Sequence, residues 1–150
     1  MSARAWTIGL ATLALVCGSA PRAFGFVMMD GPLIASLRSA LVAEFDAYNR
    51  KDVDGALKYI DTRSPDYEPT KAAMIEQFKT LDVTSELVSF EPMGHDDEFA
   101  VARVKMKTTG KPGSGFTDNT VDAVMLFHQE NGQWKMWSEQ ILGVDIAPAP

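Results

Sequence analysis

The sequence predicts one α+β domain, with helices in its first half and an antiparallel sheet in its second. Three observations lead to this prediction. Apolar residues recur at helical spacing as far as residue 81, and from residue 83 their spacing changes towards two. Asn131-Gly132, between two such strand-like segments, is typical of a two-residue hairpin turn. The length of 150 residues suits a single domain.

The first predicted helix covers residues 32–50, after the turn signal Asp30-Gly31-Pro32. Its apolar stripe comprises Leu33, Ile34, Leu37, Leu41, Phe45 and Tyr48. Three charged residues are expected mostly off this stripe, namely Arg38, Glu44 and Arg50. A helix with this pattern packs one face against the rest of the domain.

Two further helices follow. Asp52 is a good N-cap for a second helix, whose inward residues are Val53, Ala56, Leu57 and Ile60. Residues 61–69 contain two prolines and are predicted to form a loop. Thr70 is then expected to cap a third helix, whose buried stripe comprises Met74, Ile75, Phe78 and Leu81.

Four strand segments complete the predicted domain. They cover residues 84–90, 99–108, 116–129 and 133–144, and Pro92 is expected to end the first of them. A two-residue turn at Asn131-Gly132 places Glu130 opposite Gln133. The last two strands therefore form a long hairpin with a defined register.

This register sorts the hairpin into two faces. It places Phe127 opposite Met136, Met125 opposite Ser138 and Ala123 opposite Gln140. The inner face then comprises Val121, Ala123, Met125, Phe127, Trp134 and Met136, and it becomes polar at Asn119, Ser138 and Gln140. The outer face is too apolar for ordinary solvated surface because it carries Val124, Leu126, Trp137 and Ile141.

Residues 1–25 have the pattern of a secretory signal peptide, with cleavage expected between Gly25 and Phe26. Their apolar run is short for a membrane span, although an uncleaved anchor is the alternative. We therefore expect a secreted or periplasmic domain over residues 26–146, with no membrane attachment after cleavage, and a disordered tail over residues 147–150.

Composition excludes several functions. The formal charge of −6 becomes more negative after cleavage, when 12 basic and 20 acidic residues remain, and this disfavours nucleic acid as a partner. The single cysteine, Cys17, leaves with the signal, so no cysteine-based metal site or nucleophile is expected. Neither a dinucleotide fingerprint nor a serine elbow is present, and no cofactor or metal is predicted.

Two segments carry a family resemblance. Residues 45–57 (FDAYNRKDVDGAL) and 131–137 (NGQWKMW) resemble the helix–turn–helix and the closing hairpin of the nuclear-transport-factor-2-like (NTF2-like) superfamily, in its SnoaL-like branch. The resemblance covers about residues 33–145. It implies a cone, in which three N-terminal helices pack in the concave face of a curved antiparallel sheet of about four to five strands. It also implies a homodimer, for which the outer face of the hairpin is suited.

The same resemblance directs attention to the mouth of the cone. Tyr48 and Tyr59, at helix ends, and Asn119, Ser138 and Gln140, on the sheet, are the predicted ligand-binding residues. Core tyrosines with wet hydroxyls and a buried polar network are the alternative interpretations. The match to ketosteroid isomerase is poor. Its tyrosine corresponds to Glu44, neither Asp61 nor Asp66 aligns with its base, and only a register slip would bring in Asp118 or Asp122. No catalytic residue is therefore assigned.

Three functional hypotheses follow. The first is a domain that binds a small apolar molecule in its cone or serves as a dimeric accessory module. The second is a lyase, isomerase or cyclase that uses carboxylates in the pocket, and the third is a structural dimer with a filled cone. A buried pair of acidic residues in the cone would favour the second hypothesis over the first.

Overall fold

The computed structural model describes residues 27–148. The predicted signal peptide and the last two residues of the predicted tail lie outside this range. The element order is three helices followed by four strands, as expected for an α+β domain. None of the described helices is long and apolar enough to cross a membrane.

The helices are α1 (Gly31–Asn49), α2 (Val53–Leu57) and α3 (Tyr67–Thr80). The Asp30 carboxylate accepts a hydrogen bond from the Leu33 amide at 2.8 Å, and Asp52 caps α2 in the same way at Gly55. The third helix begins at Tyr67, earlier than the Thr70 cap predicted. Pro69 lies in its first turn, where a backbone N–H has no helical partner to lose.

The strands are β1 (Val83–His95), β2 (Phe99–Gly110), β3 (Asn119–Glu130) and β4 (Gln133–Ile146). They form one antiparallel sheet in the order β1-β2-β3-β4. β1 continues through Pro92, contrary to the sequence prediction. A proline is tolerated there because β1 is an edge strand and has a register shift directly after this residue.

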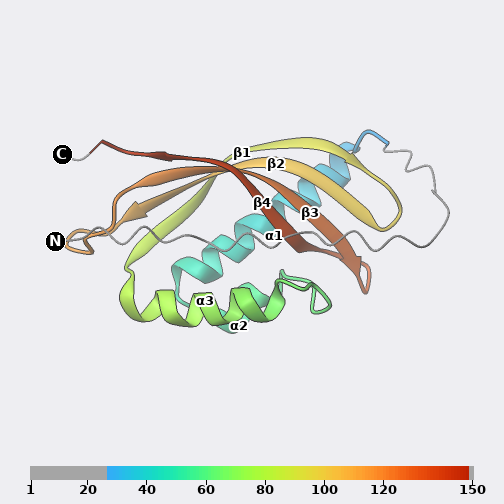
Figure 1. Ribbon diagram of the computed structural model, residues 1–150. Coiled ribbons are helices and arrows are strands. Elements are labelled where there is room, and N and C mark those ends of the chain that lie inside the picture. Colours follow the sequence, from blue (N-terminus) through green and yellow to red (C-terminus); the bar gives the residue numbers. More distant parts are fainter. Residues whose placement is uncertain (1–26, 149–150) are drawn as a thin grey trace, which may run out of the picture.

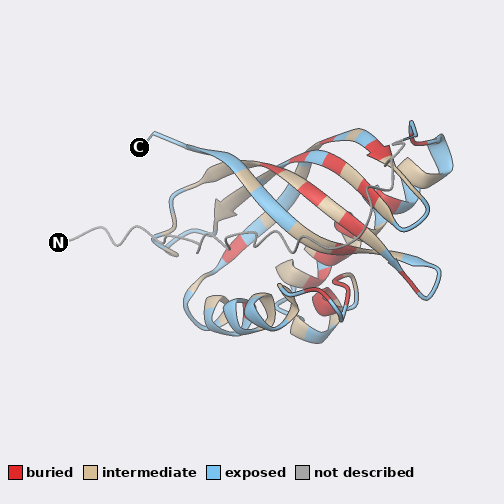
Figure 2. Cartoon of the chain, turned by 45° about the vertical axis from the view of Figure 1, so that its right-hand side comes forward, coloured by how far each residue is buried: buried red, intermediate tan, exposed pale blue. Residues whose placement is uncertain are grey.

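The helices lie on one side of a strongly twisted sheet (Figure 1). We call the sheet face that packs against them the concave face and the opposite face the convex face. The core lies between α1, α2 and the concave face, and its fully enclosed side chains include Leu37, Leu41, Ile60, Val104 and Phe127. Buried positions follow the central strands, whereas most of α3 is exposed (Figure 2).

The register of the last hairpin departs from the prediction beyond its first pairs. Asn131 and Gly132 both have positive φ, as a type I′ turn requires, and Phe127 lies opposite Met136 as predicted. A register shift then leaves Trp137 without a partner in β3, so that Met125 pairs with Glu139 instead of Ser138. A second shift at Leu142 follows. The first of these shifts, the β-bulge at Trp137, places Glu139 and Ile141 on the concave face and Ser138 and Gln140 on the convex face.

Candidate functional site

A buried carboxyl group on α1 is the most unusual feature of the concave side. Glu44 is 7% exposed and lies on the buried side of α1 with Leu37, Leu41 and Ala47. Burial, with a smaller contribution from the charge of Glu139, raises its pKa to about 8. Its carboxyl group makes no hydrogen bond to another described residue, although every fully enclosed polar side-chain atom of that range has a partner. The Glu44 oxygens therefore still border accessible space.

Two more carboxyl groups extend from Glu44 to the surface. Glu139 projects from β4 on the concave face, beside buried Met125. Its side chain is exposed to solvent, yet desolvation by the surrounding protein raises its pKa, and the charge of Asp66 adds to this effect. Asp66 directly precedes α3 and is half-buried. We call Glu44, Glu139 and Asp66 the acidic site, because the charge of Glu139 acts on Glu44 and that of Asp66 acts on Glu139.

The predicted ligand-binding residues do not gather at one place. Tyr48 donates its hydroxyl hydrogen bond to Oε1 of Gln77 on α3 at 2.9 Å, and burial raises its pKa. Asn119 begins β3 and shares the concave face with Val121. Tyr59 lies beside Met136, near the opposite end of the β3–β4 hairpin. These three half-buried residues therefore occupy separate places around the helices.

Ser138 and Gln140 lie on the convex face, contrary to the inner-face prediction. Ser138 pairs with Leu126 and Gln140 with Val124, both outward-facing positions of β3. The cause is the bulge at Trp137, because one extra residue reverses the alternation of the side chains that follow, as far as the second shift at Leu142. Ile141, predicted on the outer face, lies for the same reason on the concave face, opposite Ala123.

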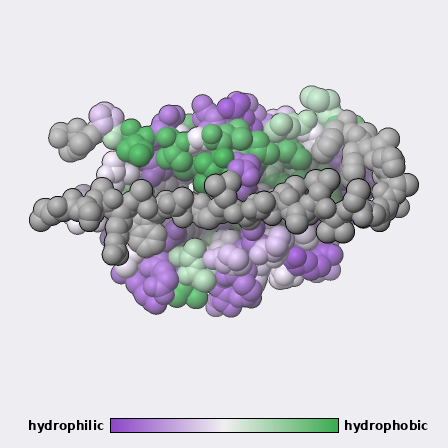
Figure 3. Space-filling model, viewed as in Figure 1, coloured by the Kyte–Doolittle hydropathy of each residue, from purple (hydrophilic) through white to green (hydrophobic). Residues whose placement is uncertain are grey.

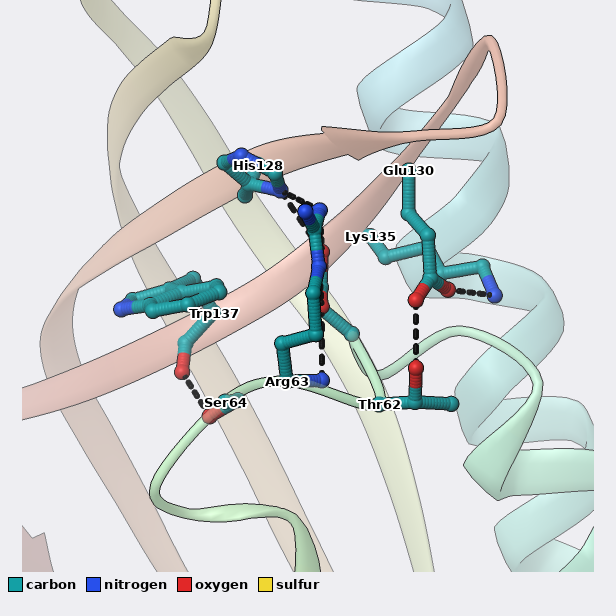
Figure 4. A network of polar contacts seen from close by, with 8 residues as sticks. Thr62, Arg63, Ser64, His128, Glu130, Lys135 and Trp137 are labelled. Carbon is teal, nitrogen blue, oxygen red and sulfur yellow. Dashed lines mark hydrogen bonds and ion pairs between the residues drawn. The ribbon is translucent and has the colours of Figure 1, made fainter.

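A second polar centre joins the loop after α2 to the β3–β4 hairpin (Figure 4). The fully buried Asp61 carboxylate lies 2.6 Å from Nδ1 of His128 and accepts hydrogen bonds from the backbone and guanidinium of Arg63. Burial alone would raise the pKa of Asp61, but the hydrogen bonds from Arg63 and His128 outweigh it and lower the pKa. The charge of Asp61 is thus fully compensated within the protein.

The residues after Asp61 extend this attachment. Thr62 donates to Oε1 of Glu130 at 2.5 Å, and the Ser64 hydroxyl donates to the backbone oxygen of Trp137. The His128 ring also packs against Trp137, with ring centroids 5.1 Å apart. We call these contacts of Asp61, Thr62 and Ser64 with the hairpin the hairpin clamp. Its polar groups are bonded to one another, and they attach the loop after α2 to the hairpin.

Other places offer less to a ligand. Within residues 27–148, no group of three acidic, histidine or cysteine side chains can hold a metal ion. The segment around His95, where Asp96 and Asp97 follow, is therefore not such a group. A hollow of about 300 Å³ lies between α1 and β1 and includes Asn49. The Asn49 amide there is already bonded to both backbone polar groups of Ser85. The Asn49 amide therefore has partners within the protein, whereas the Glu44 carboxyl has no hydrogen-bond partner among the described residues.

Comparison with known families identifies the domain. Residues 40–146 match the model of the family described as "Anti-sigma-I factor RsgI9, C-terminal domain". The chain belongs to this RsgI9 C-terminal domain family. No curated protein matches the chain at a significant level.

Solved structures show the fold of this RsgI9-type domain. It is similar to a cystatin-like protein of unknown function from Nostoc punctiforme (TM-score 0.65, 9% identity, 82% of this chain and 97% of the other). It is also similar to a putative scytalone dehydratase from Novosphingobium aromaticivorans (0.62, 8%, 79% and 90%) and to a ketosteroid isomerase-like protein from Erwinia carotovora (0.56, 15%, 76% and 99%). The predicted NTF2-like, cystatin-like α+β fold is thereby confirmed, with four strands.

The positions of Glu44 and Glu139 in this RsgI9-type domain differ from those that the sequence predicts, for two different reasons. Glu44 was expected mostly off the apolar stripe, although it follows Leu37 by seven residues and Leu41 by three, which is the spacing of one helix face. That spacing was a usable signal. Glu139 had none, because strict alternation from the turn places it on the outer face and only the bulge reverses this.

The raised pKa of Glu44 predicts a pH-dependent stability. The folded protein holds this proton to about pH 8, whereas the unfolded chain releases it near pH 4.5, the ordinary pKa of a glutamate. The folded state is therefore progressively disfavoured as pH rises through this range, by up to about 1.4 kcal/mol per pH unit. Urea unfolding from pH 5 to 8 should show a steeper decline for the wild type than for Glu44→Gln. Asp46→Asn, on the exposed side of α1, is the control, and parallel curves for all three proteins would contradict the assignment.

The hairpin clamp predicts a large stability loss for Asp61→Asn. This change leaves His128 and Arg63 without their buried acceptor charge, and we expect a loss of about 2–3 kcal/mol in the free energy of unfolding at pH 7. Asp122→Asn is a matched control, because Asp122 also pairs with an arginine (Arg103) through two hydrogen bonds but lies on the convex face. Its loss should stay below about 1 kcal/mol. Equal losses in the two variants would show that the clamp is not a buried anchor.

Proposed function

We propose that the domain binds a small, largely apolar molecule on its concave side, with the acidic site as the polar end of the binding site. The observation that carries this proposal is Glu44, a carboxyl group that is buried on α1 without a partner among the described residues. Burying such a group costs free energy that only a partner recovers. A ligand that reaches Glu44 past the exposed Glu139 is a suitable partner.

The surroundings of Glu44 support an apolar ligand body. Leu41, one turn earlier on α1, and Met125, the neighbour of Glu139 across the sheet, are both almost fully buried. Ligand sites commonly combine an apolar lining with a few polar groups. The family description supports a binding role as well, since an anti-sigma factor is a regulatory protein. From the predicted signal peptide we further propose that this binding takes place outside the cytoplasm.

Titration with Nile red, a neutral dye that fluoresces in apolar sites, tests the proposal. We expect saturable binding of about one dye per chain in the wild type. Binding should be lost in Glu44→Phe, because the phenyl ring is larger than the glutamate side chain and would fill the space next to it. Asp46→Phe on the exposed side of α1 should bind as the wild type does. Native mass spectrometry of the wild type, which needs no variant to fold, should detect a co-purified molecule. A protein with neither dye binding nor a bound molecule would have a filled cone, and the proposal would be wrong.

Acid–base catalysis is the second candidate, and the interaction between Glu44 and Glu139 favours it. A carboxyl group with a pKa near 8 beside a second carboxyl is suited to donate or accept a proton near neutral pH. Two structures of similar fold carry dehydratase and isomerase-like names, and such a role would make the domain a lyase or isomerase. Binding remains the first choice because neither the hairpin clamp nor Tyr48, which is bonded to Gln77, supplies a further catalytic group to this site.

We also propose a homodimer through the convex face. Val124 and Leu126 are half-buried there, and Trp137 packs against Phe99 and His128 at the same face. Ile141, which the sequence analysis included, is not part of it. Figure 3 shows further apolar side chains over the C-terminal half of β4, where Leu142, Val144 and Ile146 are exposed. Val144 and Ile146 pair with Val121 and Asn119 of the concave face, so they are not part of this interface. The proposed interface therefore consists of the apolar side chains around Trp137, and aromatic residues are common in partner surfaces.

Leu126→Glu tests the dimer, since it places a charge at the centre of the proposed interface without removing the Trp137 cluster. Sedimentation velocity should show a dimeric wild type and a shift towards monomer in the variant. Ile75→Glu on α3 changes an equally apolar side chain outside the interface and should leave the dimer intact. A wild type that sediments as a monomer, or a Leu126→Glu protein that stays dimeric, would contradict this interface.

A further inference from the structure

We propose that the C-terminal half of β4 pairs with the same segment of a second copy of this chain, so that two sheets join edge to edge. This contact is separate from the proposed convex-face dimer and goes beyond the proposed function. We call residues 139–146 the open edge. β4 is an edge strand, and within residues 27–148 only Met136 of this strand forms a bridge on its outer side, to Ile60. The open edge therefore has backbone groups with which no described strand pairs.

The opposite edge of the sheet, along β1, is protected. Val27 and His95 exchange two backbone hydrogen bonds there, at 2.9 and 3.0 Å. The side chain of Asn49 bonds to both backbone polar groups of Ser85, and Pro92 has no N–H to offer a further strand. Covered backbone groups and prolines are common means by which sheet edges avoid pairing with other chains. The contrast between the two edges indicates that the open edge can accept a partner.

The open edge is also apolar. Leu142, Val144 and Ile146 are 55%, 48% and 69% exposed, on the mostly exposed stretch of β4 that leads to the C-terminus (Figure 2). Residues 139–146 contain no lysine and no proline, the residues with which edge strands commonly avoid pairing. The segment between α2 and α3 covers only the part of β4 around Met136. Burial of these apolar side chains against a partner strand would favour pairing.

The hydrogen bonds between β3 and β4 show which backbone groups of the open edge point outwards. Ala147 donates its backbone N–H to the oxygen of Asp118 at 2.8 Å, so the backbone of Ile146, one residue earlier, points away from β3. The same alternation, with the register shift included, gives four outward residues, namely Glu139, Ile141, Val144 and Ile146. In agreement, the oxygen of Ile141 accepts its hydrogen bond from a side chain, that of Gln140.

The four outward residues are arranged symmetrically about the register shift at Leu142. Ile141 and Val144 flank the shift, and Glu139 and Ile146 lie one alternation further out. When two copies pair antiparallel about this centre, Ile141 of one copy lies opposite Val144 of the other. Glu139 and Ile146 form the outer pair in the same way. Each pair joins residues whose backbone groups point outwards and whose side chains share the concave face, as an antiparallel ladder requires.

Side chains also match in this register, which favours a second copy over an unrelated strand. Ile141 and Val144 form an apolar pair. On the convex face, the Gln140 amide lies opposite the Asp145 carboxylate, to which its N–H groups can donate. The two copies of Asp145 are far apart along the strands, and so are those of Glu139. No like charges are therefore opposed across the contact.

The contact is small, and its size sets its strength. Eight residues from each copy take part, whereas a stable interface commonly takes about 20–30 residues from each partner. We therefore expect the open edges to pair weakly, at protein concentrations well above those at which the convex-face dimer forms. Because the two contacts use different surfaces, edge pairing would link one convex-face dimer to the next.

Disulfide trapping at submillimolar protein tests the pairing. Cys17→Ser removes the single thiol of the sequence, and Glu139→Cys and Ile146→Cys are added at exposed positions. On mild oxidation this double-cysteine chain should form at least tenfold more covalent dimer than a chain with either cysteine alone. Residues of a hydrogen-bonded pair have Cα atoms about 5.5 Å apart, within reach of a disulfide. A single cysteine would lie about 20 Å from its own copy along the strands, which is out of reach.

Val144→Pro in the double-cysteine chain is the second test. It removes an outward N–H and none of the hydrogen bonds to β3, so the domain should fold, as checked by circular dichroism. The yield of covalent dimer should fall at least tenfold. Val144→Ala keeps the N–H and is the matched control, which should retain most of the crosslink. If Val144→Pro failed to fold, the comparison of double and single cysteines would decide alone.

The outcomes separate edge pairing from the convex-face dimer. No covalent dimer in the double-cysteine chain, or equal yields in the single-cysteine chains, would overturn the inference, and so would a crosslink that survives in folded Val144→Pro. Leu126→Glu should leave the crosslink unchanged, because it lies outside the open edge. If Leu126→Glu weakens a dimer but the crosslink does not form, the convex-face dimer stands and edge pairing is wrong.

Discussion

The β-bulge at Trp137 decides what the concave side of this domain contains. By inserting one residue into β4, it reverses the orientation of the side chains that follow, so that Glu139 faces the helices and Ser138 faces outwards. Without it, Glu44 would face a serine across the sheet instead of a second carboxyl group. The charge of Glu139, which adds to burial in raising the pKa of Glu44, therefore acts on the concave side because of this single extra residue.

The hairpin clamp holds the bulge in place. Ser64 donates to the backbone oxygen of Trp137, the residue that the bulge inserts, while the adjacent strand residue Met136 bonds to the backbone of Tyr59 and Asp61. The loop after α2 therefore acts as a short additional strand at the edge of β4. One arrangement thus satisfies the buried charge of Asp61, covers part of the edge of the sheet and fixes the position at which β4 changes register.

Local chemistry predicted much of this fold. The caps at Asp30 and Asp52 and the turn at Asn131-Gly132 depend on neighbouring residues alone, and each lies where the sequence indicates. The acidic site depends instead on contacts between distant segments. A bulge leaves no mark in a pattern of alternating residues, so the position of Glu139 was not predictable, whereas the spacing of Glu44 from Leu37 and Leu41 did indicate a buried position. The continuation of β1 through Pro92 was hidden in the same way, because only the sheet order shows that β1 is an edge strand.

The two kinds of loop in this domain differ in how they would accept added chain. The loop between β2 and β3 contains Gly113 and Gly115, both with positive φ and open space around them, and its length is not fixed by buried contacts. A foreign segment or a new pair of termini would be accommodated there at the modest entropic cost of a longer surface loop. The loop between α2 and α3 has no such freedom, because each of the four residues from Asp61 to Ser64 contacts specific atoms of the hairpin. Length variation among related domains should therefore concentrate at the first loop and avoid the second.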